Sequence, residues 1–401
     1  MNLAMDSSAQ DEFEPATENA ALVEHLRRRI DAGGPITFHD YMETVLYHPQ
    51  LGYYASRQPM GREGDYLTSP EVNPIFGALV AKQLSQLWEL LGRPQRFDLV
   101  EQGAGTGLLA HDILRWCRNR APEFAQAIRY RIVEVSPSLR RRQEERLAEM
   151  PEAEIEWREE LPDEIEGCLL SNELIDSFPV HRVVRQGDAL LELYVAQTEA
   201  GFAEQTGPLS TERIAEYFQT LNLLPGEGCT AEVNLRAVDW ANAAAQSLRR
   251  GFVLTFDYGY PAKELYAPWR REGTLLCFYQ HNPSDDPYAR VGKQDMTAHI
   301  DFTSLISAGE AHGLETAGFT SQSRFLANLG IGAGVDAIAK ESPSALEEYY
   351  ARRRAVQELI DPAGLGRIRV LAQRKDVPAV ELWGFSTEGG PAMGAQENTI
   401  A

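Results

Sequence analysis

The chain has 401 residues, of which 43% are hydrophobic and 24% are charged, a mixture typical of folded globular proteins. Lys and Arg total 38 against 59 Asp and Glu, so the formal net charge is −21. Because so negative a surface repels phosphate backbones and anionic headgroups, nucleic acid and membrane surfaces are poor bulk partners. A basic peptide or protein partner fits better, although an acidic balance is more often only a solubility feature. No apolar run approaches the roughly 18 residues that a membrane span needs.

The cysteines and the N-terminus indicate a cellular compartment. Cys117, Cys168, Cys229 and Cys277 form no CxxC pair or Cys/His cluster, so we predict no metal site and expect reduced thiols. Residues 1–19 contain several acids and no Lys or Arg, which predicts a disordered acidic tail. This composition differs from secretory signals and from mitochondrial presequences. We therefore expect a bacterial-type cytoplasmic protein.

The first predicted elements form an N-terminal cap over residues 20–92. Apolar residues at helical spacing predict a helix over 20–32, which ends at a Gly-Gly-Pro sequence. Turn formers and tyrosines over 36–75 predict an ordered region rich in loops. A further helix is predicted over 73–91.

Strands and helices then alternate, which predicts an α/β fold with a doubly wound, mainly parallel sheet over residues 93–375. The expected strands are 96–101, 130–135, 155–157, 167–171 and 251–257, and the expected helices include 138–150, 210–222 and 234–249.

Three later features complete the predicted architecture. Short runs joined by glycine turns over 181–207 predict an antiparallel hairpin, within an insertion that we place at 181–233. Runs at 274–280 and 369–373 are expected to complete the main sheet around a helix near 302–312. Residues 376–401 are expected to form a C-terminal tail.

The strongest local motif is E-x-G-x-G-x-G, which follows a strand and begins a helix. Its defining residues are Glu101, Gly103, Gly105 and Gly107, and Ala104 lies between the first two glycines. Glycines let the backbone turn sharply beside a ligand, and the helix N-terminus offers unpaired N–H groups. A dinucleotide fingerprint needs a glycine where this chain has leucine, at position 108. The pattern is typical of class I S-adenosylmethionine (AdoMet) methyltransferases, in which the acid lies near the methionine ammonium.

Two residues at the ends of the next strands extend this predicted cofactor site. Glu134 ends the second strand, where a carboxylate can accept hydrogen bonds from both ribose hydroxyls. An exposed acid without a ligand is the alternative. Trp157, at the end of the third strand, either stacks on adenine or belongs to the core.

The fourth strand leads into a turn that we expect to face the reacting methyl group, because ligands of such sheets bind at the carboxyl ends of strands. Asn172, Glu173 and Asp176 lie in this turn, and Asp257 ends the fifth strand on the same edge. Paired carboxylates can orient an arginine guanidinium for in-line methyl transfer. We assign catalysis to Glu173, Asn172 and Asp257, and we expect Asp176 to cap the next helix.

Several segments together resemble the MidA family of AdoMet-dependent methyltransferases. They are 46–54, 64–77, 101–107, 171–180, 254–258 and 295–302, in the same order as in the family, and the resemblance covers roughly residues 20–375. The mitochondrial branch is a protein arginine methyltransferase needed for respiratory complex I assembly. The resemblance implies a class I methyltransferase core with an N-terminal cap at the AdoMet site. It also implies that Thr68, Ser69 and Glu71 approach the cofactor, although spacing alone indicates only a helix cap.

The sequence thus predicts an AdoMet-dependent methyltransferase, with arginine of a protein as the favoured acceptor. One alternative is an assembly factor that binds AdoMet without catalysis. Another is a nicotinamide-dependent oxidoreductase, which the leucine at position 108 disfavours. The acceptor protein is not identified by the sequence, and a homodimer is left open.

Overall fold

The computed structural model describes residues 18–56, 67–332 and 346–386. The acidic tail predicted for 1–19 therefore lies outside the described residues up to residue 17, as does most of the predicted tail at 376–401. The chain is an α/β protein whose largest sheet has seven strands, in the order β16-β17-β10-β5-β2-β3-β4. These strands are β2 (Phe97–Gln102), β3 (Ile128–Val133), β4 (Glu154–Arg158), β5 (Ile165–Asn172), β10 (Leu248–Asp257), β16 (Glu315–Ser321) and β17 (Arg369–Lys375).

The five central and edge strands from β10 to β4 run parallel, as the alternating sequence pattern predicts. Strand β17 is antiparallel to both of its neighbours, β10 and β16. In the central strands, successive residues face opposite layers: Leu170 packs in one core cluster and Leu169 in the other. The carboxyl ends of β2, β5 and β10 meet at one edge, because Gln102 pairs with Ser171 and Asn172 pairs with Phe256.

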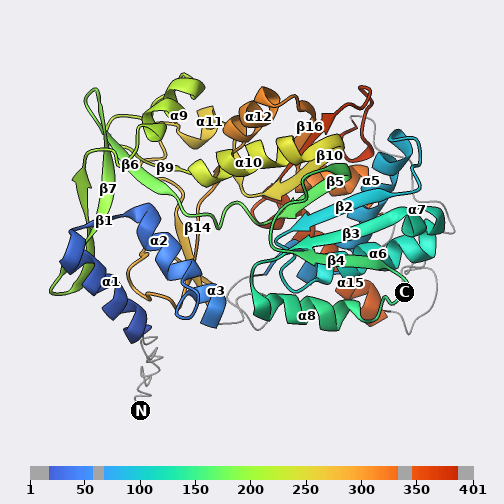
Figure 1. Cartoon of the computed structure of the whole chain (residues 1–401), viewed down its shortest axis with the longest axis horizontal. Coiled ribbons are helices and arrows are strands. Elements are labelled where there is room, and N and C mark those ends of the chain that lie inside the picture. Colours follow the sequence, from blue (N-terminus) through green and yellow to red (C-terminus); the bar gives the residue numbers. More distant parts are fainter. Residues whose placement is uncertain (1–17, 57–66, 333–345, 387–401) are drawn as a thin grey trace, which may run out of the picture.

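Helices cover both faces of this sheet (Figure 1). One face is covered by α10 (Leu235–Ser247) and α12 (Phe302–Ala311). The other core cluster includes residues of α5 (Ile75–Leu90), α6 (Leu108–Arg120), α7 (Pro122–Ala127), α8 (Pro137–Leu147), α13 (Gln322–Asn328) and α15 (Leu346–Ile360). The predicted cap boundary at residue 92 stays a prediction, although α5 packs in the core of the main sheet.

The antiparallel hairpin insertion is confirmed, and it forms a sheet of its own at the left of Figure 1. Its strands are β6 (His181–Gln186), β7 (Ala189–Thr198), β8 (Gly201–Gly207) and β9 (Thr230–Val233), which lie within 181–233, together with β1 (Ile36–Thr37) from the N-terminal region. The flanking helices are α1 (Ala20–Gly33), α2 (Phe38–Tyr47), α3 (Tyr53–Ser56) and α9 (Arg213–Leu221).

Of the two later runs expected in the main sheet, the run at 369–373 lies there as part of β17, but the expectation for the other was wrong. The run at 274–280 does not join the main sheet: β12 (Leu276–Tyr279) pairs with β13 (Asn282–Ser284) and β14 (Asp295–Thr297) in a separate sheet. The place next to β17 is taken instead by β16, a glycine-containing strand whose residues are only half-buried and carry little hydrophobic signal. A two-stranded sheet joins β11 (Gly259–Tyr260) to β15 (Ile300–Asp301), and short helices are α4 (Ser69–Val72), α11 (Ala262–Leu265), η2 (Leu365–Arg367) and η3 (Trp383–Phe385).

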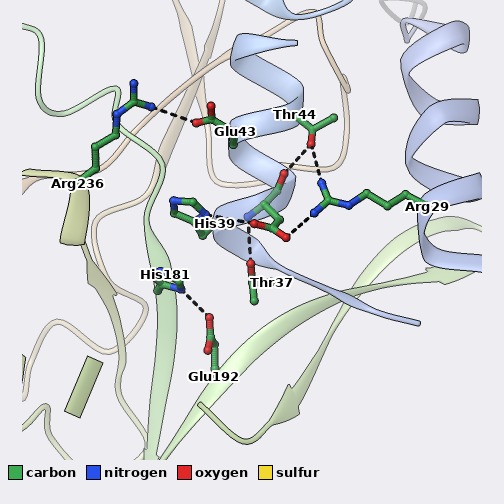
Figure 2. A network of polar contacts seen from close by, with 9 residues as sticks. Arg29, Thr37, His39, Glu43, Thr44, His181, Glu192 and Arg236 are labelled. Carbon is green, nitrogen blue, oxygen red and sulfur yellow. Dashed lines mark hydrogen bonds and ion pairs between the residues drawn. The ribbon is translucent and has the colours of Figure 1, made fainter. Parts of the chain in front are cut away.

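A ring stack joins α2 to the insertion sheet, and a hydrogen bond within the sheet supports it (Figure 2). The imidazole rings of His39 and His181 stack with centroids 4.7 Å apart, and His181 Nδ1 lies 2.7 Å from Glu192 Oε1. Burial alone would raise the pKa of Glu192, but hydrogen bonds from His181 and from the Ser210 N–H outweigh it and leave the pKa below its ordinary value. The ionised form of Glu192 therefore stabilises this junction.

We expect Glu192→Gln to lower the free energy of unfolding by about 1–3 kcal/mol at pH 7, because it removes a charged acceptor from a buried hydrogen bond. A lowered carboxyl pKa contributes stability above the ordinary pKa and loses it as the pH falls through the folded-state value. The difference between wild type and variant should therefore shrink in acid. Urea unfolding at pH 7 and at pH 4 measures it, and an equal difference at both values would contradict the assignment.

Candidate active site

Two cavities lie at the carboxyl edge of the main sheet, and Glu173 lines both. We call them the turn cavity, of about 40 Å³, and the acceptor cavity, of about 270 Å³. The turn cavity contains eight of the predicted site residues: Thr68, Glu71, Glu101, Gly103, Ala104, Gly105, Asn172 and Glu173. Residues from three separate sequence motifs therefore meet there.

The glycine-rich turn has the conformation that its sequence predicts. Gly103, Gly105 and Gly107 all have positive φ, at 77°, 52° and 77°, in the left-handed region that favours glycine. A Cβ on Gly103 would lie 2.7 Å from Leu174 Cδ1, and a Cβ on Gly107 would lie 3.2 Å from the Cα of Gln143. Gly107 therefore serves the close packing of α6 and α8 and does not line the turn cavity.

Acceptor atoms without partners lie in the turn cavity. Among the described residues, Glu71 Oε2 and Asn172 Oδ1 are buried and have no hydrogen-bond partner. Burial raises the pKa of Glu71, and it raises the pKa of Glu101 to about 7 although the Tyr130 hydroxyl donates to Glu101 at 2.6 Å. Unpaired buried acceptors cost free energy, so this cavity is suited to a ligand that brings N–H donors, such as an ammonium group.

Glu134 and Trp157 lie outside both cavities but are connected to the turn. The buried Gln143 on α8 donates from Nε2 to the Gly105 carbonyl at 2.9 Å and to Glu134 Oε2 at 3.0 Å. Its Oε1 accepts from Trp157 Nε1 at 3.1 Å. Sequence reasoning missed Gln143. Nothing in the sequence of this highly charged helix indicates that one glutamine bonds to Gly105, Glu134 and Trp157, which lie at the ends of three strands.

Glu134 is positioned by hydrogen bonds at both carboxylate oxygens, since the Ser136 N–H donates to Oε1 at 2.8 Å. Each oxygen keeps a second lone pair for a ligand hydroxyl. We expect Glu134→Ala to weaken AdoMet binding by about 1–3 kcal/mol, the scale of hydrogen bonds to a charged group.

Isothermal titration with AdoMet measures this effect, and the matched control is Glu156→Ala, which removes an exposed carboxylate from the neighbouring strand β4. The control should bind as wild type does. An unchanged dissociation constant in Glu134→Ala would contradict the prediction that Glu134 binds the ribose hydroxyls.

Glu173 is held in an unusual backbone conformation. Its φ is 49°, in the left-handed region that a glutamate rarely adopts, and such strain is common at functional sites. Its N–H donates to the Phe256 carbonyl, while Oε1 accepts from the Ser69 N–H at 3.0 Å and from Asn172 Nδ2 at 3.1 Å. Burial nevertheless raises the pKa of Glu173 to about 7. The carboxyl group can therefore exchange a proton near neutral pH.

Two further acids line the acceptor cavity, Asp176 and Asp295. Burial first, and then the neighbouring Asp257, Glu173 and Asp295, raise the pKa of Asp176 well above its ordinary value. The Tyr54 hydroxyl donates to Asp295 at 2.8 Å. Aromatic and aliphatic side chains form much of the remaining wall, including Tyr54, Leu67, Tyr258, Leu276, Phe278 and Leu365. A cavity with apolar walls and a group of acids is suited to a long cationic side chain.

The expectation that Asp176 caps a helix was wrong, because the next element is strand β6. The structure places Asp257 behind the turn that follows β5, and its side chain does not lie in a cavity wall. Its oxygens accept from the N–H groups of Ile175 and Tyr258, both at 2.8 Å, and it lines neither cavity. Asp257 therefore holds the backbone that carries Glu173 and Asp176.

The segment after the aromatic region reaches the site through its backbone and one side chain. Thr68 precedes α4, but its hydroxyl makes no capping hydrogen bond, and it lines the turn cavity. Ser69 is fully buried; its N–H supports Glu173, and its hydroxyl donates to Gln322 Oε1 at 3.1 Å. Ser69 thus acts on the site by holding Glu173.

The residues that the structure describes contain no group of three or more His, Cys, Asp or Glu placed to hold a metal ion. The four cysteines are buried and unpaired with one another. Within the same described ranges, no helix is long and apolar enough to cross a membrane.

The chain is similar in sequence to known methyltransferases. The family model Methyltransf_28, an S-adenosyl-L-methionine-dependent methyltransferase, matches residues 79–320. The protein arginine methyltransferase NDUFAF7 homolog, mitochondrial, of Drosophila melanogaster is 30% identical over 91% of this chain and 87% of its own. The human protein arginine methyltransferase NDUFAF7, mitochondrial, is 28% identical over 86% of this chain and 81% of its own.

A solved structure is similar over nearly the whole chain. It is a COG1565 superfamily member from Burkholderia thailandensis bound to S-adenosyl-homocysteine, which is 33% identical, with a TM-score of 0.82. The match covers 97% of this chain and 99% of that chain.

Proposed function

Because the chain belongs to the family of S-adenosyl-L-methionine-dependent methyltransferases, we propose that it methylates an arginine side chain of a protein. The cofactor is AdoMet, and the fold is that of the class I methyltransferases. The relatives named as protein arginine methyltransferases support the acceptor class, and the acids of the acceptor cavity support it independently.

The observation that carries the proposal is the position of Glu173 in both cavities. The turn cavity is suited to the methionine end of AdoMet. Glu71 Oε2 and Asn172 Oδ1 have no hydrogen-bond partner among the described residues, so they could accept hydrogen bonds from the ammonium group of AdoMet. When bound, AdoMet supplies an electrophilic methyl group on a sulfonium. The acceptor cavity adjoins the turn cavity at Glu173, so an acceptor side chain bound in the acceptor cavity would approach this methyl group.

The acids of the acceptor cavity suit a guanidinium in two ways. Ionised Glu173 and Asp176 would orient the guanidinium by charge-assisted hydrogen bonds, and its positive charge would in turn lower their raised pKa values. The nitrogen that gains the methyl group must lose one proton. Glu173, ionised beside the guanidinium, would accept that proton as the methyl group is transferred.

The test is to label a lysate with methyl-tritiated AdoMet and purified protein, and then to identify the modified residue in acid hydrolysates. We expect labelled methylarginine in a protein band. A labelled lysine or small molecule would contradict the acceptor class. AdoMet binding without any labelled product would favour an assembly factor that does not catalyse methyl transfer.

The cytoplasmic location of the protein stays a prediction.

A further inference from the structure

A group of cationic and aromatic side chains lies at the ends of β10, β11 and η2; it is called here the cationic cluster. The guanidinium of Arg367 lies 5.4 Å from the ring centroid of Tyr258, and those of Arg270 and Arg369 lie 4.8 Å and 5.8 Å from that of Tyr260. The imidazole of His299 is nearly parallel to Tyr258 and also contacts Tyr260, with centroids 6.2 Å and 5.4 Å away. Three arginines are thus concentrated around two tyrosines and a histidine.

These arginines are poorly paired, which is unusual in a chain with 59 acids and 38 bases. Within the described ranges, no carboxylate forms an ion pair with Arg270 or Arg367, and Arg369 has only Glu264, at 4.0 Å. The Nε atoms of Arg270 and Arg369 and the Nδ1 atom of His299 are buried there without a hydrogen-bond partner. The Nε–H groups of Arg270 and Arg369 are buried donors without acceptors, which costs free energy, so the cluster is suited to an anionic ligand.

The cationic cluster is continuous with the acceptor cavity, because Tyr258, His299 and Arg367 are among the residues that line that cavity. Burial, and then the charges of Arg367 and Arg270, lower the pKa of His299 to about 3, so its ring is neutral at pH 7. The positive charge of the cluster therefore comes from the arginines alone. The lining of the same cavity includes three acids, Glu173, Asp176 and Asp295, together with Arg367.

We propose that the cationic cluster binds a carboxylate of the acceptor, so that the acceptor is a protein segment with an acidic side chain near the methylated arginine. This inference rests on the proposed function, since the acids of the cavity would hold the guanidinium. Arg367 would bind the carboxylate at the cavity, and Arg270 would add charge beside it. Arginine suits this role because its planar guanidinium can bind a carboxylate with two parallel hydrogen bonds while it stacks on an aromatic ring.

The test uses four fluorescent peptides that separate the two parts of the acceptor. Each is a glycine-serine peptide with one central residue, arginine or citrulline, flanked on both sides by glutamates or by glutamines. Binding is measured by fluorescence anisotropy with S-adenosyl-homocysteine present, so no catalytic turnover is required. We expect the arginine peptide with glutamates to bind wild type roughly tenfold more tightly than its glutamine counterpart, and the ratio to fall as salt is added.

Variants then assign the preference to the cluster. In Arg367→Gln and in Arg270→Gln, we expect the glutamate preference to fall to about threefold or less, while the preference for arginine over citrulline remains. The matched control is Arg118→Gln, an exposed arginine on α6 that pairs with Glu152 outside both cavities. It should behave as wild type does.

Two results would overturn the inference: equal affinity of wild type for the glutamate and glutamine peptides, including no binding of either, or a preference that survives in both cluster variants. Loss of the proposed function has a different signature. In that case arginine and citrulline peptides would bind wild type equally, whatever residues flank them.

Discussion

Glu173→Gln should lower the single-turnover rate of methyl transfer by about a hundredfold or more, with the affinity for AdoMet changed by less than about threefold. The substitution keeps the size of the side chain but removes the charge that would orient the guanidinium and the site that would accept its proton. The backbone donor at Ser69 can still bond to the amide oxygen, so the turn should keep its conformation. The measurement is rapid-quench transfer from tritiated AdoMet, with affinity determined in parallel.

The control for Glu173→Gln is another buried acid outside both cavities. Asp301 caps α12, accepts a hydrogen bond from the Tyr217 hydroxyl and has its pKa raised to about 6, mainly by burial. Asp301→Asn should cost stability but leave the transfer rate near that of wild type. Full activity in Glu173→Gln would contradict the assignment and direct attention to Asp176.

The pH dependence follows from the same group. Because burial raises the pKa of Glu173 to about 7, kcat/KM should rise with pH and level off above a midpoint near 7. Because the pKa of Glu173 is raised from its ordinary value of 4.5 to about 7 in the folded state, its contribution to folding stability falls as the pH rises between these two values and then levels off, and a bound guanidinium would reduce this loss. Glu173→Gln should lack this midpoint, and a wild-type profile that is flat from pH 6 to pH 8 would contradict it.

Gly105→Val should abolish measurable AdoMet binding, a loss of at least about a hundredfold, while the protein stays folded. Gly105 lines the turn cavity at φ 52°, where a β-branched side chain is strained, and its carbonyl accepts from Gln143. The added side chain would shift the turn and fill the space that we propose for the methionine end of AdoMet. Titration calorimetry and thermal unfolding measure the two effects.

Gly187→Val supplies the matched control, because Gly187 has a similar φ of 61° in the turn between β6 and β7 and nothing within 4 Å of a Cβ. It carries the same kind of backbone strain without a cavity beside it. Both variants should therefore lose a similar amount of stability, and only Gly105→Val should lose AdoMet binding. Wild-type binding by Gly105→Val would refute the placement of the methionine end.

Much of the fold could be predicted from the sequence because its central strands are buried and apolar. Strands β2, β3, β5 and β10 contain runs of apolar residues that are buried between helical layers, so hydrophobic periodicity and the flanking turn residues predict these strands. Strand β16 could not be found in this way, because it lies at an edge and only part of its surface is buried. The run at 274–280 has strand character, but no local signal says which sheet it joins.

The candidate site divides along the same lines. The glycine turn and Glu173 follow strands directly, so the parallel order of the sheet places them together. Gln143, Asp295 and Arg367 reach the site from distant parts of the chain, through contacts that only the tertiary structure creates. The expectation that Asp176 caps a helix was wrong because an aspartate in such a turn has the same local sequence pattern whether it caps a helix or faces a cavity.

We propose that a cofactor cavity and an acceptor cavity meet at Glu173. A crystal structure with S-adenosyl-homocysteine and an arginine peptide tests it most directly. We predict the homocysteine end against Gly103 and Gly105, and the guanidinium in the acceptor cavity within hydrogen-bond distance of Glu173. A guanidinium bound elsewhere, with the cofactor sulfur separated from Glu173 by intact protein, would contradict the claim.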